Sequence, residues 1–432
     1  MLITACDNDL DQIPPLDAEA SSLTSFTEVL NAAYYYQQAS ATPMAIMGDF
    51  RADNMLMAEE PYPAFDRFNA DLAGGDLVEQ FFRPFYSNLY KSILSANNVI
   101  ENSEDATQIG EAQFLRGLSY FKLVQAFGDV TVNLTPAPDV SDKSILARQS
   151  AADIYSTVII PDLRDAISAL DNSTIGSGRA SQIAARGILG KVYMHMGDFG
   201  SAETELSAVI NGADAAGISL QANFADIFGE DNDLNSEIIF ATQLSTSIDD
   251  EYDFTGFPGW FSGGDTKSLT PLDSDLIAAF DAVASDTLDG GDLRRALTID
   301  TATMTSPKWG GLDQDWIELR LGDVVLLHAE AMNETGASAE DVLDLLDPIR
   351  TRAGLNPLDH TVLNTQALVG QAIADERRLE LALEGQRWFD LVRTGTVDAE
   401  MGEAINSNYH LFPIPNSEVL ASDGAITQNP GY

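Results

Sequence analysis

Two short segments carry side chains whose types and spacing could hold a hydroxyl-bearing ligand. The first, Gly256 to Asp265, sets Trp260 and Phe261 among glycine and proline residues. Aromatic rings pack against the C–H face of a sugar ring, and a segment rich in glycine and proline seldom belongs to a core helix. Trp260 is therefore the first candidate for a stacking platform, with Phe261 beside it. The alternative is that Trp260 fixes this loop to the body of the protein.

The second segment is polar and runs from Gly48 to Asn54. It brings hydrogen-bond acceptors and donors together on an expected loop, through the side chains of Asp49, Arg51, Asp53 and Asn54. Such groups suit the hydroxyls around the rim of a sugar ring. A local salt bridge among them is the alternative interpretation. Trp309 and Tyr62 are further candidates for ligand binding.

The sequence contains no constellation typical of an enzyme. A GxSxG motif, a P-loop and a zinc-binding spacing are absent, and the four histidines stand far apart, at positions 195, 328, 360 and 410. Four acids, Asp273, Asp275, Asp289 and Asp292, are interpreted as solvated surface residues, because a chain with 67 acidic residues forms such groups by chance. We expect no catalytic residue.

One acidic run resembles the start of a calcium loop, namely Asp231-Asn232-Asp233-Leu234-Asn235. An EF-hand needs glycine at the sixth position and glutamate at the twelfth, where this chain has Ser236 and Thr242. An EF-hand is therefore not expected, and an irregular calcium site remains an open alternative. No other cofactor is expected.

Charge excludes several classes of partner. The chain has 23 Lys and Arg against 67 Asp and Glu, a net charge of −44. A field of this sign repels phosphate backbones and anionic lipid surfaces, so the sequence predicts no nucleic-acid binding. The same negative charge keeps the chain soluble in salty water, where screening over about 8 Å or less weakens the repulsion between its acidic residues.

The single cysteine, Cys6, excludes an intramolecular disulfide and lies close to the start of the chain. Ile3-Thr4-Ala5-Cys6 fits the pattern at which bacterial lipoproteins are cleaved and lipidated, and the polar, proline-ended stretch after it has the character of a tether. We therefore expect a lipid anchor at Cys6, behind a signal segment of which only the end is present. The alternative is a solitary cysteine near a frayed terminus. No run of about 18 apolar residues occurs in the chain.

Helical periodicity dominates and predicts a mostly α-helical fold. Apolar residues at helical spacing, each series stopped by a glycine, indicate helices over residues 110–127, 179–196 and 318–334, and the last two are followed by helices over 201–211 and 339–352. Such pairs have the look of tetratricopeptide-like hairpins. Residues 212–316 are rich in loops, with a short β-like run at 237–241. We expect a tether (1–20), a helical scaffold (21–211), a loop-rich ligand region (212–316) and C-terminal hairpins (317–432).

The strongest local signal is Glu376 to Gly395, ERRLELALEGQRWFDLVRTG. Its pattern predicts one helix, with Arg377 paired to Glu380 and Glu384 paired to Arg387 at i, i+3. The concentration of rare positive charge there indicates partly buried ion pairs that hold this helix to the body. A catalytic pair of glutamates is the functional alternative.

This segment closely resembles the C-terminal signature of the SusD/RagB family, together with LFPIPNSEV at 411–419 and TQNPGY at 427–432. Members of that family are outer-membrane lipoproteins of Bacteroidetes. Further similar motifs follow in the expected order, namely YKSILSANNVI at 90–100, AQFLRGLSYFKLVQAFGDV at 112–130, AARGILGKVYMHMGDFGSAE at 184–203, LRLGDVVLLHAEAMNETG at 319–336 and IRTRAGL at 349–355. The resemblance covers nearly the whole chain. This chain departs from the family pattern in three ways. It has His328 where a tyrosine is more usual, it lacks the start of the signal segment, and its overall length is short.

The resemblance implies a scaffold of four tetratricopeptide-like hairpins with an irregular loop region packed on it. Such proteins are similar to lids that sit over a SusC-like TonB-dependent transporter and capture a nutrient, usually a glycan, without catalysis. By position, Asp49, Arg51, Asp53 and Asn54 resemble the polar cluster that often lines the family's ligand site. We therefore expect a cell-surface, outer-membrane glycan-binding lipoprotein, and charge alone favours a neutral glucan or fructan.

Three other functions remain open from the sequence. A RagB-like lid would capture peptide, a protein-interaction scaffold would use the helical hairpins, and a glycoside hydrolase would need two carboxylates across a cleft.

Overall fold

The computed structural model describes residues 25–139, 142–247, 256–263, 271–288 and 291–432. Within these ranges the chain is mostly helical, with two small antiparallel sheets of two strands each. The predicted fold class, a tetratricopeptide-like helical scaffold with an irregular region that carries short strands, is confirmed. Cys6 lies outside the described residues.

The N-terminal helices are α1 (Thr27–Gln37), α2 (Ala41–Ala45), α3 (Gly75–Leu77), α4 (Arg83–Asn102) and α5 (Ala106–Phe127). The helix predicted over 110–127 is α5, which begins one turn earlier. Asp105 caps it by accepting hydrogen bonds from the backbone N–H groups of Thr107 and Gln108. It ends at Gly128, whose φ of 69° lies in the region that favours glycine.

The middle of the chain forms β1 (Val130–Thr131), β2 (Arg148–Gln149), α6 (Ala151–Ile154), α7 (Ile160–Ala169), α8 (Gln182–Met196) and α9 (Phe199–Ala213). Ser181 and Asp198 cap α8 and α9 through their side chains, and Gly197 turns the chain between the two helices. This is the hairpin that the sequence predicts over 179–211.

The loop-rich region forms β3 (Ile238–Thr242), α10 (Phe257–Ser262), α11 (Ser274–Ala282) and α12 (Leu293–Thr298), followed by β4 (Trp316–Arg320). The β-like run at 237–241 is confirmed as β3. It pairs antiparallel with β4, with Ile238 opposite Arg320 and Thr242 opposite Trp316. The expectation that the segment around Trp260 forms a loop is wrong, because proline at the start and Gly263 at the end delimit the short helix α10, whose aromatic residues are buried.

The C-terminal helices are α13 (Leu321–Thr335), α14 (Ala339–Arg352), α15 (Gln366–Glu380), α16 (Arg387–Thr394), α17 (Val397–Glu400) and α18 (Asn416–Ala421). The single helix predicted over 376–395 is wrong. The chain leaves the helix after Glu380 and resumes it at Arg387, with Leu383 and Gly385 at positive φ between them. Residues 381–386 are called the helix break below.

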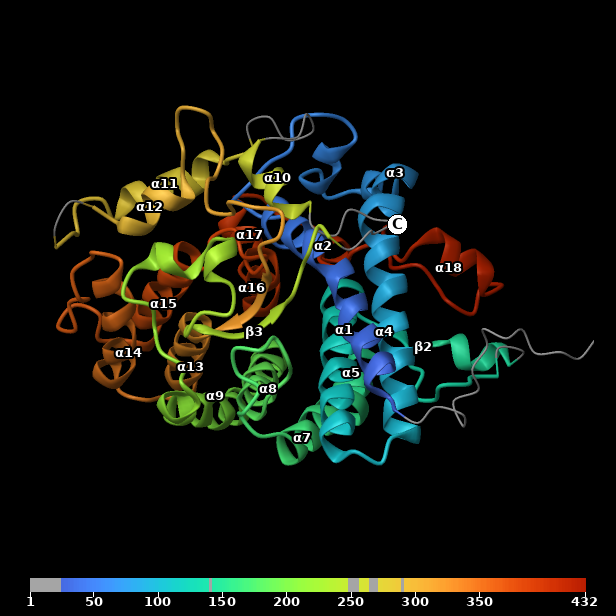
Figure 1. The fold of residues 1–432 in the computed structure, drawn as a ribbon. Coiled ribbons are helices and arrows are strands. Elements are labelled where there is room, and N and C mark those ends of the chain that lie inside the picture. Colours follow the sequence, from blue (N-terminus) through green and yellow to red (C-terminus); the bar gives the residue numbers. More distant parts are fainter. Residues whose placement is uncertain (1–24, 140–141, 248–255, 264–270, 289–290) are drawn as a thin grey trace, which may run out of the picture.

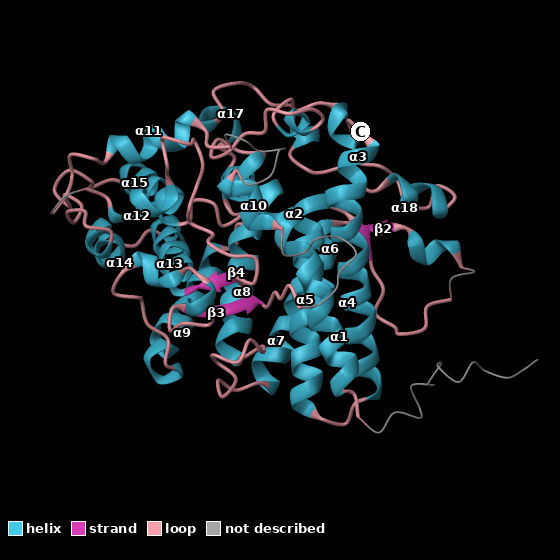
Figure 2. Ribbon diagram, turned by 45° about the horizontal axis from the view of Figure 1, so that its top comes forward, coloured by secondary structure: helices cyan, strands magenta, loops and turns pink. Residues whose placement is uncertain are grey.

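Figures 1 and 2 show how these elements are arranged. Helices α1, α4 and α5 lie side by side at one side of the molecule, α13, α14 and α15 lie at the other, and α7, α8 and α9 connect the two groups. One hydrophobic core runs through the chain from Phe26 to Ile426, and a smaller cluster lies between α13, α14 and α15. No described helix has the length and apolar character needed to span a membrane.

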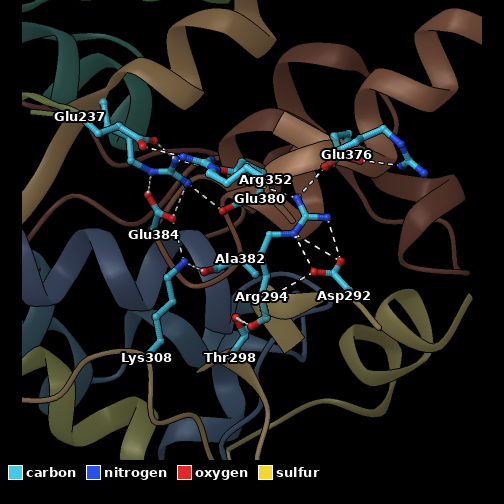
Figure 3. Close-up of polar contacts among 12 residues, drawn as sticks. Glu237, Asp292, Arg294, Thr298, Lys308, Arg352, Glu376, Glu380, Ala382 and Glu384 are labelled. Carbon is cyan, nitrogen blue, oxygen red and sulfur yellow. Dashed lines mark hydrogen bonds and ion pairs between the residues drawn. The ribbon is translucent and has the colours of Figure 1, made fainter. Parts of the chain in front are cut away.

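A buried ion network holds the helix break to the rest of the molecule (Figure 3). It consists of five cations, Arg294, Lys308, Arg320, Arg350 and Arg352, and five carboxylates, Glu237, Asp292, Glu376, Glu380 and Glu384. Glu380 contacts Arg294, Arg320 and Arg352. Burial alone would raise the pKa of its carboxyl group, but the three guanidinium groups outweigh burial and hold that pKa well below its usual range. These partners come from α12, β4 and α14.

The network corrects three predictions. Glu380 does not pair with Arg377, which instead bonds Asp323 and Asp390. Glu384 does not pair with Arg387, because the helix break removes the i, i+3 geometry that such a pair requires. Asp292 is no solvated acid, since its carboxylate is buried against Arg294 with an Nη2–Oδ2 distance of 2.8 Å. The prediction of buried ion pairs that fix this segment to the body is confirmed.

Aromatic side chains fill the core beneath α10. The ring of Trp260 lies edge-on to the rings of Phe50, Tyr62 and Phe81, with centroid distances of 6.4, 5.3 and 5.5 Å. Phe261 stacks on Phe50. Only 4% of the surface of Trp260 is exposed, so its ring presents no face on which a sugar could stack.

We expect Glu380→Gln to destabilise the fold by about 3–5 kcal/mol, because it leaves an uncompensated positive charge in the interior. Urea denaturation followed by circular dichroism measures this change in the free energy of unfolding. Glu79→Gln is the matched control, since Glu79 pairs with Arg83 on the surface and its loss should cost less than about 1 kcal/mol. Equal effects of the two variants would contradict a structural role for the network.

We expect Trp260→Ala to lower the free energy of unfolding by about 3–5 kcal/mol, as removal of a large buried ring does. The same denaturation experiment tests it. If the variant kept wild-type stability and lost ligand affinity instead, the interpretation of Trp260 as a core residue would be wrong.

Candidate ligand-binding site

The structure places the predicted polar residues 49–54 in the interior, around the helix break. Asp49 accepts hydrogen bonds from the backbone N–H groups of Leu383 and Gly385, at 3.2 and 2.7 Å, and from Asn54 Nδ2. These bonds satisfy backbone donors that the interrupted helix leaves open. Burial raises the pKa of Asp49 to about 6.

Asp53, Asn54 and Arg51 are also committed to internal contacts. Asp53 forms ion pairs with Arg387 and Arg378, and Asn54 Oδ1 accepts from Arg378 Nε. Arg51 donates to the backbone carbonyls of Phe65 and Tyr409, and its guanidinium lies 4.3 Å from the ring centroid of Phe68. The prediction that these side chains surround a ligand is corrected. Asp49, Asp53 and Asn54 bond residues of the C-terminal signature, and Arg51 bonds two backbone carbonyls in the interior.

The predicted aromatic residues are buried as well. Trp309 donates from Nε1 to the carbonyl of Leu383 in the helix break and stacks on Trp316. Tyr62 donates to Gln80 Oε1 at 2.9 Å. Trp260, Phe261, Trp309 and Tyr62 therefore form the core and no exposed platform. The alternative interpretation of Trp260, a residue that ties its segment to the body, describes its environment.

A different cleft combines aromatic and polar groups. It lies between α1, the turn at Gly178 and Arg179, and the residues that follow β3, and its volume is about 390 Å³. The Tyr35 cleft, as it is called below, is lined mainly by Asn31, Tyr34, Tyr35, Gln38, Arg179 and Gln243. Its size suits part of an oligosaccharide chain.

The floor of the Tyr35 cleft is a closed set of polar contacts. Glu111 accepts hydrogen bonds from Tyr34 Oη at 2.5 Å and from Arg179 Nε at 2.7 Å. The guanidinium of Arg179 lies 4.2 Å from the ring centroid of Tyr34 and donates to Asn31 Oδ1. Burial beside Glu111 raises the pKa of Tyr34 well above its usual range. The floor is therefore rigid, and the charge of its one arginine is balanced.

The rim of the cleft offers a ring and amide groups. Tyr35 is half-buried and packs edge-on against Tyr36 at a centroid distance of 5.5 Å. Gln38 Nε2 donates to the backbone carbonyl of Gln243 at 2.8 Å, which joins the turn directly after α1 to the segment after β3. The Gln243 side chain is exposed and passes close over Gly178, where a Cβ atom would lie only 2.4 Å from it. Phenol and carboxamide groups at this spacing suit the hydroxyls of a neutral sugar.

A second cavity, of about 230 Å³, lies beside the helix break, and its charged walls are already paired. Arg377, Arg378, Arg387 and Arg393 line it, and each forms an ion pair with a nearby carboxylate. Because these arginines are already neutralised by these carboxylates, they stabilise the fold and offer no unpaired charge to a ligand. We therefore do not assign a ligand to this cavity.

Carboxylates of the predicted calcium run lie near a second acidic segment. Asp233 Oδ1 accepts the backbone N–H of Asp315, and Asp315 Oδ1 accepts that of Leu244. Burial, with a smaller contribution from neighbouring carboxylates, raises the pKa of Asp233 to about 6 and that of Asp315 to about 7. Among the described residues, the only group of three potential metal ligands within 4.8 Å is elsewhere, at Asp344, Asp347 and His360.

Sequence reasoning missed Tyr35 and its neighbours because their pattern is that of an ordinary amphipathic helix. The run Tyr34-Tyr35-Tyr36-Gln37-Gln38 was a usable signal. Three consecutive tyrosines cannot all face the core of one helix, so at least one ring must lie towards the surface.

The fold matches solved structures over nearly its whole length. A SusD superfamily protein of Bacteroides vulgatus superposes with a TM-score of 0.76 at 21% identity, and the match covers 96% of this chain and 99% of that one. A laminarin binding SusD-like protein superposes with a TM-score of 0.72 at 24% identity, covering 95% and 99%. At these identities the likeness establishes a shared fold.

Sequence comparison gives the same assignment from two separate parts of the chain. Residues 10–194 match a family described as starch-binding associating with outer membrane, and residues 289–432 match the SusD family. SusD-like protein P2 of Formosa agariphila is 25% identical over 414 residues, which cover 81% of this chain and 80% of that protein. The chain belongs to the SusD-like proteins, and the two family models that it matches carry the descriptions SusD family and starch-binding associating with outer membrane.

Proposed function

We propose that this protein captures a neutral oligosaccharide or polysaccharide in the Tyr35 cleft at the cell surface and passes it to a SusC-like TonB-dependent transporter. The single observation that carries this proposal is the cleft itself, in which a half-buried tyrosine ring lies beside carboxamides on a rigid floor. The starch-binding description of the matched family and the laminarin-binding neighbour support the ligand class. Binding without chemical conversion follows from this role.

Charge balance supports a neutral ligand. Arg179 is the only cation among the described residues that line the cleft, and Glu111 already pairs with it. A carboxylated or sulfated glycan would enter a site without a free counter-charge, in a chain of net charge −44. Neutral glucans and fructans meet no such barrier.

We also propose that Cys6 carries the lipid anchor that holds the protein at the membrane. The residues after it have the composition of a flexible tether, and a lipidated cysteine anchors a globular body without a spanning helix. The outer-membrane association named for the matched family supports this placement.

We expect Tyr35→Ala to weaken neutral glycan binding about tenfold or more, because an aromatic contact contributes about 1.5 kcal/mol. Isothermal titration against maltohexaose, laminarin, inulin and alginate measures the affinities, with alginate as the anionic comparison. Tyr36→Ala is the matched control on the same helix, since Tyr36 lies outside the residues that line the cleft.

Equal affinity of wild type and Tyr35→Ala for every neutral glycan that binds would contradict the assignment of the site. Tighter binding of alginate than of the neutral glycans would contradict the ligand class.

The irregular calcium site suggested by the sequence is a further proposal, between Asp233 and Asp315. A bound Ca²⁺ would neutralise two neighbouring carboxylates, neither of which forms an ion pair within the described residues. We expect millimolar CaCl₂ to raise the melting temperature relative to EDTA by several degrees, because saturating ligand adds about 2–3 kcal/mol. Differential scanning fluorimetry measures it, and MgCl₂ is the ionic control.

The Asp315→Asn variant should lose most of this gain. Identical melting temperatures in EDTA and CaCl₂, or the same gain in Asp315→Asn, would rule the site out.

A further inference from the structure

A third cleft lies at the opposite end of α5 from the Tyr35 cleft. It has a volume of about 750 Å³ and is bounded by the C-terminal ends of α5 and α8, by β2 and the start of α6, and by the C-terminal tail at 427–430. This third cleft is called the His195 cleft, because His195 lies in its wall. The two clefts share no lining residue. Glu111 lies beneath the Tyr35 cleft and Gln125 lines the His195 cleft. These two residues are 14 positions apart on α5, which corresponds to about 21 Å of helix.

The His195 cleft contains hydrogen-bonding groups that the fold does not use. Gln125 Nε2 lies 3.0 Å from His195 Nε2, so the amide donates and His195 Nε2 accepts. This assigns the imidazole proton to Nδ1, which has no acceptor among the described residues. Tyr155 Oη likewise forms no hydrogen bond within the described ranges, and Asp129 uses only Oδ1, which accepts the backbone N–H of Ala151 at 2.9 Å. The unused groups thus include two neutral donors and one carboxylate oxygen.

The cations in the cleft wall are already committed. Arg148 donates to the backbone carbonyls of Phe127, Asp129 and Thr427 and to Asn429 Oδ1. Arg393 forms ion pairs with Glu330 and Asp390. Burial lowers the pKa of His195 to about 3 and raises that of Tyr155 beyond its usual range, so both stay neutral near pH 7. An anionic ligand would therefore have to displace hydrogen bonds that Arg148 makes within the protein, or compete with the carboxylates paired to Arg393.

Apolar surface completes the cleft. Val124, Leu411 and Pro430 lie in its wall beside the polar groups. Neutral donors, a single carboxylate acceptor and an apolar face together match the hydroxyls and the C–H face of a sugar ring better than they match a phosphate, a carboxylate or a peptide backbone.

We propose that the His195 cleft is a second saccharide site, in which a neutral sugar unit accepts hydrogen bonds from His195 Nδ1–H and Tyr155 Oη–H and donates one to Asp129. The site does not depend on the Tyr35 cleft. A polysaccharide long enough to reach both clefts would be held at two points, which raises its apparent affinity without any new contact.

The four histidines of the chain allow a direct test. In a protein with ¹⁵N-labelled histidine side chains, maltohexaose and laminarihexaose are titrated while the imidazole resonances are recorded by NMR. We expect the His195 signals to shift saturably with at least one of these sugars. His360, on the loop after α14 and paired with Asp344 and Asp347, is the internal control and should not shift.

Variants separate this site from the Tyr35 cleft. Tyr35→Ala should leave the His195 titration unchanged, whereas Tyr155→Phe and Asp129→Asn should each weaken it about fivefold, as the loss of one hydrogen bond does. The proposal is overturned if neither sugar shifts His195 at millimolar concentration, or if both variants keep the wild-type affinity. A His195 shift that Tyr35→Ala abolishes would also overturn it, because the effect would then come from the other cleft.

Discussion

Charge balance in the interior is the constraint on which the rest of the structure depends. Five cations and five carboxylates are removed from water around the helix break, and each group is stable there only while its partners stay in place. The network requires α15 to end at Glu380, because only then can Glu380 and Glu384 reach Arg320 from two directions. The open backbone groups of the break are in turn satisfied by Asp49 and Trp309. The ion network thus joins α12, β4 and α14 to the end of α15.

This arrangement also decides which side chains remain available to a ligand. The polar segment 49–54 and all the tryptophans are used inside the molecule. What remains towards the surface is a tyrosine ring beside amides at one end of α5 and a histidine beside a tyrosine at the other. Arginine occurs in both clefts, yet in each it is held by groups of the protein itself. The two clefts therefore differ from the strongly acidic chain as a whole, because neutral polar side chains make up most of the hydrogen-bonding groups that line them.

The fold could be predicted from the sequence to a large extent, whereas the site could not. Helix ends were legible because Gly128, Gly197 and Gly336 stop apolar repeats. The helix break at 381–386 could not be predicted, because Leu381 and Leu383 continue the helical pattern. The contacts that stabilise the break come from Arg320 and Asp49, which are distant in the sequence. Trp260 was misplaced for the same reason. A glycine- and proline-rich segment predicts a turn, but burial depends on Phe50, Tyr62 and Phe81, which the local pattern cannot reveal.

The span of the ion network along the chain has a consequence for how the molecule is made. Its members range from Glu237 to Glu384. Asp292 and Glu237 are synthesised before Arg294 and Arg320, but Glu376, Glu380 and Glu384, which complete the neutralisation of these arginines, come well after them. Until residue 384 has been synthesised, a compact C-terminal half would enclose unbalanced positive charge. Completion of the native state therefore waits for almost the whole polypeptide, and a prematurely terminated product lacks the carboxylates that balance its interior charge.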